Sequence, residues 1–564
     1  MDKLLEINNL VIDFHSEQGM TRAVDGISFF LNKGETLGIV GESGSGKSVS
    51  SLSIMRLLPA SARCQTDSTV YWKNAATNLL TIPDDQMQKI RGAQIAMIFQ
   101  EPMTSLNPVF RCGEQVTEAI QIHQKVNFET AKKQALSWFE KVKLPDPERI
   151  FNAYPHQISG GQKQRVMIAM AMSCNPDLLI ADEPTTALDV TVQKAILDLM
   201  RDLRAETGLS MLFISHDLGV ISEICDRVIV MHQGKVVEEG PVEQVLSNPS
   251  HPYTKGLVAC RPSLKQKLWR MPTVPDFLEH GHFEARVITH EEDQSRCAQL
   301  QSQRPILEVS HLQVRYPAKK SWWGKTTEWT NAVQDISFEV YPGETFGLAG
   351  ESGCGKTTLG RTIARLTDAH SGEILYKGQN LLTMSDAEFR PFRKEIQVVF
   401  QDPYASLNPK MTIGEAILEP MKVHQLYGND AARKAKTIEL LEIVGLKADH
   451  YQRYPHQFSG GQRQRICVAR ALALEPKFLV CDEMVSALDV SVQATVLNLL
   501  MELRETFGLT YLFISHDLSV IKQMCDRLMV MNQGQMEVLG YPEDIYTRPE
   551  RPYVQKLIEA IPGK

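Results

Sequence analysis

The sequence has no long hydrophobic run, no basic leader and no closely paired cysteines. No stretch reaches the about 18 consecutive apolar residues that a membrane-spanning helix needs. The first 15 residues show no basic segment followed by an apolar core, so we expect no secretion signal. The ten cysteines include no Cys-x-x-Cys pair, which is the pattern expected of reduced thiols. These features predict a cytoplasmic protein without a transmembrane segment.

Positive charge is in the minority. The chain has 60 Lys and Arg against 67 Asp and Glu, a formal net charge of −7. This balance disfavours a broad electrostatic attraction to nucleic acid, although it does not exclude a local basic patch. At 564 residues the chain is also too long for one hydrophobic core, so we expect several folding units.

What the sequence does contain is a long internal repeat. The stretch ISGGQKQRVMIAMAMSCNPDLLIADEPTTALDVTVQ at 158–193 returns as FSGGQRQRICVARALALEPKFLVCDEMVSALDVSVQ at 458–493. Upstream of each copy lies a sequence of the form G-x-x-x-x-G-K-[ST], at 41–48 and at 350–357. A period this long, with small insertions, indicates two duplicated domains and not an array of short repeats.

Each glycine-rich sequence stands between a predicted strand and a predicted helix. In the first half, the apolar run 36–40 precedes it and a helix predicted to run through residue 58 follows it. This is the context of a phosphate-binding loop (P-loop), in which backbone N–H groups, a helix N-terminus and Lys47 face anionic oxygens, while Ser48 is placed to bind Mg²⁺. Two matches followed by the same later motifs make a chance origin negligible. The loop residues predicted to bind the nucleotide are Gly41, Gly44, Gly46, Lys47, Ser48, Gly350, Gly353, Gly355, Lys356 and Thr357.

A pair of acids follows a predicted buried strand in each half. The continuous apolar run 178–181 is typical of a parallel strand buried on both faces, and it ends in Asp182 and Glu183. Adjacent buried acids without a cation are unusual. We therefore assign Asp182 to Mg²⁺ and Glu183 to polarising the attacking water. Asp482 and Glu483 repeat the pair in the second half.

Two other motifs have more than one interpretation when a single copy is considered. Gln100 ends the apolar run 95–99, and Gln401 ends a similar run in the second half. Their amides could coordinate Mg²⁺ or position water, or they could simply cap a strand. Ser159, in the Ser-Gly-Gly-Gln turn before a predicted helix, could contact a phosphate or serve as an N-cap, and one copy alone favours the cap.

These motifs together resemble those of the ABC (ATP-binding cassette) ATPases, and the resemblance covers nearly the whole chain. It implies two α/β P-loop domains, each with a parallel-sheet core, an antiparallel β-layer and a helical subdomain. The expected boundaries are 1–260 for the first domain, 261–304 for a proline-interrupted, partly ordered linker, and 305–564 for the second domain. Some relatives carry a cysteine cluster in this linker, but Cys260 and Cys297 alone offer too few ligands for an iron–sulfur centre.

The resemblance also implies where the nucleotide binds. ATP, with Mg²⁺, is expected between the P-loop of one half and the Ser-Gly-Gly-Gln turn (the signature turn) of the other. His216 and His516 are expected at the γ-phosphate. Residues 187–189 and 487–489 resemble the loop through which the two cassettes sense one another. Mg²⁺ ligands are expected at Ser48, Gln100, Asp182, Thr357, Gln401 and Asp482. The signature residues expected at ATP are Ser159, Gly161, Gln162, Ser459, Gly461 and Gln462.

Aromatic residues suggest further contacts. Phe14 and Tyr316 stand at matching places near the end of the first strand of each half and by resemblance could stack on adenine, although a strand aromatic is usually core. The insertion 317–331 mixes lysines with tryptophans. Such a loop can bind nucleic acid by stacking, but more often it packs locally or touches a protein partner, so we expect no nucleic-acid partner.

Two positions differ between the halves near the expected ATP sites. Met484 follows Glu483 in the second half, whereas Pro184 follows Glu183 in the first half. We therefore expect two active sites that need not be equal. Cys354 replaces Ser45 in the second P-loop, and its place before a helix favours the thiolate. We therefore expect maleimide to modify this thiol if it is accessible, and bound ATP to cover it.

Two short motifs narrow the expected function. Leu-Asn-Pro occurs at 106–108, shortly after Gln100, and again at 407–409, shortly after Gln401. Residues 247–257 read SNPSHPYTKGL. Both motifs resemble the peptide and nickel importer branch of the family. The resemblance implies a fused tandem ATPase subunit that drives uptake of a solute, with a peptide as first choice, through two transmembrane permease subunits served by a solute-binding protein. It would lie on the cytoplasmic face of the inner (plasma) membrane. Met103–Leu106 and Tyr404–Leu407 are expected beside the permeases.

The alternative is a soluble ABC-type translation factor that acts on the ribosome. Those factors resemble this chain in the cassette core, but they join their halves by a long, charged helical linker. Here prolines at 262, 272 and 275 interrupt the linker.

Overall fold

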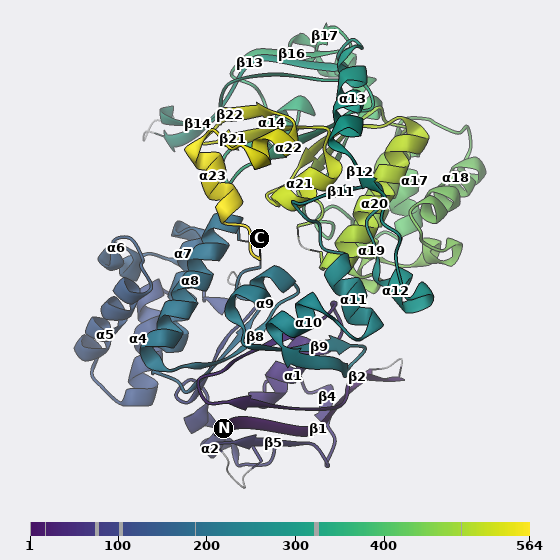
Figure 1. The fold of residues 1–564 in the computed structure, drawn as a ribbon. Helices are drawn as coiled ribbons and strands as arrows, with labels where there is room; N and C mark the ends of the chain where they lie inside the picture. The colour runs from purple at the N-terminus through teal and green to yellow at the C-terminus, as the bar shows by residue number, and fades with distance from the viewer. Residues whose placement is uncertain are drawn as a thin grey trace.

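The computed structural model describes the chain except for residues 1, 17–18, 74–77, 101–104, 187, 321–325, 487 and 564, and the side chains of 16, 319–320 and 326–327. Two halves of similar architecture face one another, the first in purple and blue and the second in green and yellow (Figure 1). In the described part of the chain, no helix combines the length and apolar character needed to cross a membrane.

Each half is built on a six-stranded sheet. The strand order is β10-β9-β3-β8-β7-β6 in the first half and β18-β19-β20-β15-β21-β22 in the second. All neighbours pair in parallel except the strand of each sheet that comes last in the sequence, β10 or β22, which pairs antiparallel. The strands are Thr36–Val40 (β3), Ile95–Ile98 (β6), Leu178–Asp182 (β7), Ser210–Ile214 (β8), Arg227–His232 (β9), Lys235–Pro241 (β10), Thr345–Ala349 (β15), Ile396–Val399 (β18), Phe478–Asp482 (β19), Thr510–Ile514 (β20), Arg527–Asn532 (β21) and Gln535–Gly540 (β22).

The predicted parallel strands are confirmed, and their burial explains their composition. Strands β3, β7 and β8 are buried at every residue, as are β15, β19 and β20, so apolar side chains point to both faces. Because parallel strands end at the same edge, the P-loop, the glutamine, the acid pair and the histidine of each half converge there.

An antiparallel layer covers each core, as predicted. In the first half, β1 pairs with β2, β4 and β5; in the second, β13 pairs with β14 and β16, and β17 extends the sheet. The strands are Lys3–Ser16 (β1), Gly19–Asn32 (β2), Ala62–Cys64 (β4), Thr69–Trp72 (β5), Leu307–Lys320 (β13), Thr326–Val340 (β14), Ser371–Tyr376 (β16) and Gln379–Asn380 (β17). Their inward residues join the parallel sheet in one core per half.

The helical subdomain that the resemblance implies is present in each half. Residues at three- and four-residue spacing, such as Val116 and Ile120, are buried between neighbouring helices. The helices are Cys112–Gln124 (α4), Phe128–Lys141 (α5), Pro147–Asn152 (α6) and Gly160–Met172 (α7), with Ile413–Val423 (α17), Asp430–Ile443 (α18) and Gly460–Leu472 (α19) in the second half. This confirms the predicted helical subdomains.

The helix after the first P-loop is shorter than predicted. It is α1, Lys47–Ile54, and not a helix through Leu58. Arg91 donates from Nε to the carbonyl of Met55 at 2.7 Å and from Nη2 to that of Arg56 at 3.0 Å. A distant side chain thus satisfies the last carbonyls, and Arg56 adopts a left-handed φ of 50° that ends the helix.

The segment between the halves has more regular structure than the predicted partly ordered linker. It contains Lys267–Leu268 (β11), Val274–His280 (α12), Val287–Ile288 (β12) and His290–Gln301 (α13). It packs on the second half: Lys267 Nζ donates to the carbonyl of Cys525 at 2.8 Å, and Arg296 Nε donates to Asp526 Oδ1 at 2.9 Å. Pro275 lies in the first turn of α12, where a proline is tolerated, and α13 contains no proline.

The C-terminal helix of each half also contacts the other half. Pro252–Ala259 (α11) of the first half contacts Val490–Phe507 (α20) of the second, and Pro552–Glu559 (α23) contacts Val190–Thr207 (α8). Figure 1 shows α23 reaching down to the first half, with the C-terminus between the halves. The backbone N–H of Gly563 donates to Glu223 Oε1 at 3.2 Å.

Candidate functional site: two nucleotide sites between the halves

The P-loop of the first half closes around its own lysine. Lys47 Nζ donates to the carbonyls of Gly41 and Glu42 at 2.7 and 2.9 Å, so the loop is already curved about the cation. Gly41 has a φ of 152°, and a Cβ there would lie 2.2 Å from the Met231 carbonyl oxygen. Only glycine lets the loop approach the neighbouring strand so closely.

The second P-loop repeats this geometry. Lys356 Nζ donates to the carbonyls of Gly350 and Glu351 at 2.8 and 2.9 Å. The hydroxyl after each lysine faces the acidic strand end: Ser48 Oγ donates to Asp182 Oδ1 at 3.0 Å, and in the second half the equivalent distance is 2.8 Å. The predicted hydroxyl–aspartate pairs are thus brought together in both halves.

Glu183 stands at the centre of the first site. It adopts a left-handed φ of 48°, a strained conformation for a residue with a side chain, and is buried. Its Oε2 accepts hydrogen bonds from Gln100 Nε2 at 3.0 Å and Thr186 Oγ1 at 2.9 Å, and it lies 3.2 Å from His216 Nδ1. The structure therefore gathers the predicted glutamine, glutamate and histidine around one carboxylate.

The two adjacent acids have opposite electrostatic behaviour. Burial raises the pKa of Asp182 to about 6. Burial acts on Glu183 in the same direction, but the hydrogen bond and charge of His216 outweigh it and lower the pKa of Glu183 to about 2. Glu183 is therefore an ionised acceptor at neutral pH, as a group that polarises water must be.

The second acid pair follows the same pattern. Gln401 Nε2 donates to Glu483 Oε2 at 3.1 Å, and His516 Nδ1 lies 3.4 Å from the same oxygen. Burial raises the pKa of Asp482, whereas for Glu483 the contacts with His516 and Lys356 outweigh burial and lower the pKa. Lys356 Nζ lies 3.5 Å from Glu483 Oε1.

The signature turns are N-caps in this structure. Ser159 Oγ accepts from the N–H of Gln162 at 3.3 Å, and Gln162 Oε1 accepts from the N–H of Ser159 at 3.0 Å. Ser459 and Gln462 form the same reciprocal pair at 3.4 and 3.0 Å. The capping interpretation is correct, and contact with a phosphate stays a prediction.

The start of α8, the start of α20 and Asp489, which directly precedes α20, contact the P-loop of the opposite half. Thr191 Oγ1 donates to Glu351 Oε1 at 2.7 Å, and Ser491 Oγ donates to Glu42 Oε1. The N–H of Ser43 donates to Asp489 Oδ2 at 2.9 Å. Asp489 belongs to the second predicted sensing loop, which therefore touches the other half. Thr191 and Ser491 lie just after the two predicted loops, in the first turns of α8 and α20. Residues 187 and 487 lie outside the described part of the chain.

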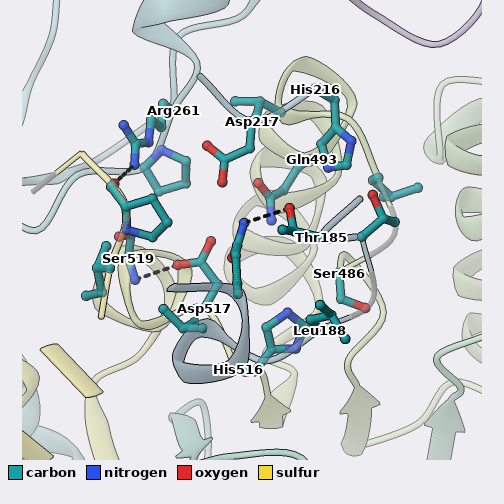
Figure 2. Close-up of a pocket in the computed structure, with 18 of the residues that line it drawn as sticks. Thr185, Leu188, His216, Asp217, Arg261, Ser486, Gln493, His516, Asp517 and Ser519 are labelled. Carbon is teal, nitrogen blue, oxygen red and sulfur yellow. Dashed lines mark hydrogen bonds between the residues drawn. The ribbon is translucent and has the colours of Figure 1, made fainter. Parts of the chain in front are cut away.

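A polar cavity of about 130 Å³ lies between the two sites. His216 and Asp217 line it from the first half, His516 and Asp517 from the second, and Figure 2 shows these side chains around one space. Arg261 reaches it as well and donates to the carbonyl of Pro562. The two histidines thus line one cavity that both halves build.

The two predicted adenine-stacking residues are placed differently. Tyr316 is exposed, and its hydroxyl lies 3.5 Å from Thr358 Oγ1, beside the second P-loop helix. Phe14 is half-buried and packs against the core of the first half. Stacking on adenine stays a prediction for both residues.

The tryptophan-rich insertion is described only in part, since Trp322 and Trp323 lie outside the described residues. Trp329 is exposed, with the Arg315 guanidinium 4.5 Å from its ring centroid. At this position the basic–aromatic mixture is a local contact within the β-layer.

Two site residues were missed from sequence. The hydroxyl of buried Tyr253 accepts from the N–H of Glu42 at 3.0 Å, and that of Tyr553 accepts from the N–H of Glu351 at the same distance. Each tyrosine lies on the C-terminal helix of its half, α11 or α23, and contacts the P-loop of the same half. The signal was present, because His-Pro-Tyr at 251–253 and Arg-Pro-Tyr at 551–553 occupy matching places.

The prediction of a reactive Cys354 thiol is wrong. The residue is only 5% exposed, and burial raises the pKa of its thiol. Its sulfur would lie 2.8 Å from a Cβ at Gly350, so it fills the inside of the loop.

We therefore expect maleimide to modify Cys354 at least about tenfold more slowly in the folded protein than after denaturation, because the thiolate form is disfavoured and covered. Mass spectrometry of the peptide that contains it measures this ratio. Denatured protein from the same preparation is the control. Equal labelling rates would contradict the buried position.

Comparisons with known proteins bear on these sites. Residues 24–186 and 333–486 each match the family model for the ABC transporter, and residues 237–280 match that for the oligopeptide/dipeptide transporter, C-terminal region. The chain belongs to the ABC transporter family. As an ABC protein it binds ATP and is an ATPase that powers transport, in an importer of the oligopeptide/dipeptide type with separate membrane permeases.

This ABC protein has close relatives over its whole length. It is 46% identical over 570 residues to the glutathione import ATP-binding protein GsiA of Salmonella choleraesuis (strain SC-B67), covering 99% of this chain and 89% of that protein. The GsiA of Escherichia coli (strain K12) gives the same identity and coverage over 568 residues. The solved dimeric structure of the ATP-binding cassette MJ0796 in a post-hydrolysis state is 29% identical, with a TM-score of 0.39, covering 42% of this chain and 99% of that one. The findings do not favour the translation-factor alternative.

Proposed function

We propose that this chain hydrolyses ATP at two composite sites to drive uptake of a short peptide, with glutathione as the first candidate. The relatives that cover it end to end are named for glutathione import. The solute would pass through two permease subunits after delivery by a solute-binding protein, with the ATPase at the cytoplasmic face of the inner membrane. No nucleic-acid partner is part of this proposal.

The observation that carries the composite sites is the contact in both directions between the halves. Thr191 reaches the P-loop at Glu351, and Ser491 reaches the P-loop at Glu42. Each of these residues begins the helix on which a signature turn of the same half packs, because a Cβ on Gly161 would lie 2.7 Å from Val192 Cγ1. Each signature turn is therefore held on the side that faces the opposite P-loop.

The residues at each strand edge fit Mg²⁺. A buried aspartate with a raised pKa, a hydroxyl bonded to it and a nearby amide are the oxygen ligands that this ion prefers. We assign the ion to Ser48, Gln100 and Asp182 in the first site, and to Thr357, Gln401 and Asp482 in the second. When bound, Mg²⁺ neutralises charge on the phosphate oxygens.

The remaining residues act on the nucleotide and the water. Glu183 accepts a hydrogen bond from the attacking water and orients it, and His216 holds both that carboxylate and the terminal phosphate in place. Lys47 and the loop amides bind the phosphates. Glu483, His516 and Lys356 do the same in the second site, and Phe14 and Tyr316 face the bases.

Exposed apolar side chains mark where permeases dock. Ile122 on α4 is 63% exposed and Val423 on α17 is 56% exposed, at matching positions of the two helical subdomains. In the second half a groove of about 470 Å³ lies beside Val423, with Arg393 and Arg470 in its lining. The aligned first-half positions carry Gly92 and Met170. The two faces differ in charge, which supports two non-identical permeases.

The predicted permease segments need one correction. Leu106 and Leu407 are 1% and 2% exposed, so they are core residues, and polar substitutions there would destabilise the fold. Tyr404, 50% exposed, stays available for docking. Met103 lies outside the described residues.

The test is an affinity pull-down of the tagged full-length chain from detergent-solubilised cells in the presence of ATP. We expect two permease subunits with the wild type, and loss of both from the double variant Ile122→Asp, Val423→Asp, because a charge on each apolar face opposes docking. Leu278→Asp, an exposed leucine on α12, is the matched control and should retain both. Recovery of ribosomes without permeases would contradict the proposal.

A further inference from the structure

The carboxylate of Asp489 lies inside the first nucleotide site although it belongs to the second half. Its Oδ2 accepts from the backbone N–H of Ser43, an amide at the turn of the first P-loop, at 2.9 Å. The N–H groups of a P-loop are the groups that bind phosphate oxygens. One anionic side chain therefore holds a donor that the nucleotide also uses.

The equivalent residue of the first half does something else. Asp189 Oδ1 accepts from the backbone N–H of Val192 at 2.9 Å, so it caps its own helix α8. Asp489 stands at the same N-cap position of α20 but makes no side-chain capping bond. Because an N-cap side chain stabilises its helix, the contact with Ser43 replaces a favourable interaction.

Asp489 also acts electrostatically on two groups of the first site. Burial lowers the pKa of Lys47, and among the carboxylates that oppose this effect Asp489 ranks first, ahead of Glu183 and Asp182. Asp489 also acts on His216 in the direction that favours its cationic form. The carboxylate thus lies among the amide, the lysine and the histidine assigned to the terminal phosphate.

We propose that Asp489 competes with the terminal phosphate of ATP for the Ser43 amide, and that the first site therefore takes up ATP less readily than the second. The inference rests on the proposed nucleotide site at Lys47. ATP binding there displaces Asp489, which is then free to cap α20 as Asp189 caps α8. The two sites load in a set order, the second before the first.

Equilibrium titration of the purified full-length chain with AMP-PNP, a nonhydrolysable ATP analogue, and with ADP tests this. Lys356→Ala isolates the first site and Lys47→Ala isolates the second. In the Lys356→Ala background, Asp489→Asn should tighten AMP-PNP binding about tenfold, because a charge-assisted contact that excludes the phosphate is lost. ADP binding should change less than threefold, because ADP lacks the terminal phosphate. Asn is as good an N-cap as Asp, so α20 is retained.

The matched control is Asp189→Asn in the Lys47→Ala background, where AMP-PNP binding should change less than twofold. Equal effects of the two substitutions, or equal gains for ADP and AMP-PNP, would overturn the inference while leaving the proposed sites in place. If Lys47→Ala itself leaves the number of bound nucleotides unchanged, the site assignment fails and the inference fails with it.

Discussion

The double variant Glu183→Gln, Glu483→Gln should hydrolyse ATP about 10²–10⁴-fold more slowly than the wild type, because it loses both groups assigned to polarise water. Glutamine keeps the size of glutamate but cannot carry its negative charge. Gln100 and Thr186 donate to Glu183 Oε2, and the glutamine side-chain oxygen can still accept from both. We therefore expect the fold and nucleotide binding to be retained while hydrolysis is lost.

The measurement is the steady-state release of phosphate, with nucleotide binding measured on the same preparation. The single variants are the controls, since each leaves one glutamate in place and reports the share of each site. Turnover of the double variant within a factor of two of wild type would refute the assignment of both glutamates. Loss of nucleotide binding would instead show that the substitution damaged the site.

Arginine in place of Gly160 should lower nucleotide trapping at least about tenfold at the site built on Lys356, while sparing the site built on Lys47. A bulky cation in the signature turn obstructs the phosphates that the turn is expected to contact, and lost contacts of this kind typically cost a factor of about 10²–10³ in rate. The contact of Thr191 with Glu351 sets this crossed pairing.

The local structure makes this a clean experiment. A Cβ at Gly160 would have only Leu188 Cδ2 nearby, at 3.9 Å, so a side chain fits within its own half. Gly460→Arg is the matched control, because its nearest neighbour is Leu488 Cδ2 at 3.8 Å, and it should impair the opposite site. Nucleotide trapped by vanadate and cross-linked to each half gives the site-resolved readout. Impairment of the same-half site by either substitution would contradict the head-to-tail arrangement.

Most of the architecture could be predicted from sequence because its signals are local. The apolar runs 36–40 and 178–181 predict strands that the structure contains as β3 and β7. The glycines of each P-loop and the adjacent acids mark a site from a few neighbouring residues. Repetition of the same motifs in both halves, together with the family resemblance, favours the functional interpretation of Gln100 and Gln401 over strand capping.

Features that depend on distant partners could not be predicted in this way. The end of α1 is set by Arg91, which is distant from it in the sequence. The linker is ordered because it docks on Cys525 and Asp526. Cys354 precedes a helix as expected, but packing buries it inside the loop. Helical periodicity alone does not show that Leu106 belongs to the core.

By itself the sequence determined that this chain has two ATP-binding cassettes with a full set of nucleotide-binding motifs in each. Those motifs act through backbone geometry and chemistry within short segments, so the residue order is sufficient to define them. Only the tertiary structure decided which loop meets which P-loop, and that Asp489 turns to Ser43 while Asp189 caps its own helix. Two nearly identical sequences adopt these different contacts because each faces a different partner across the interface, and a hydrogen bond between halves depends on how the halves dock.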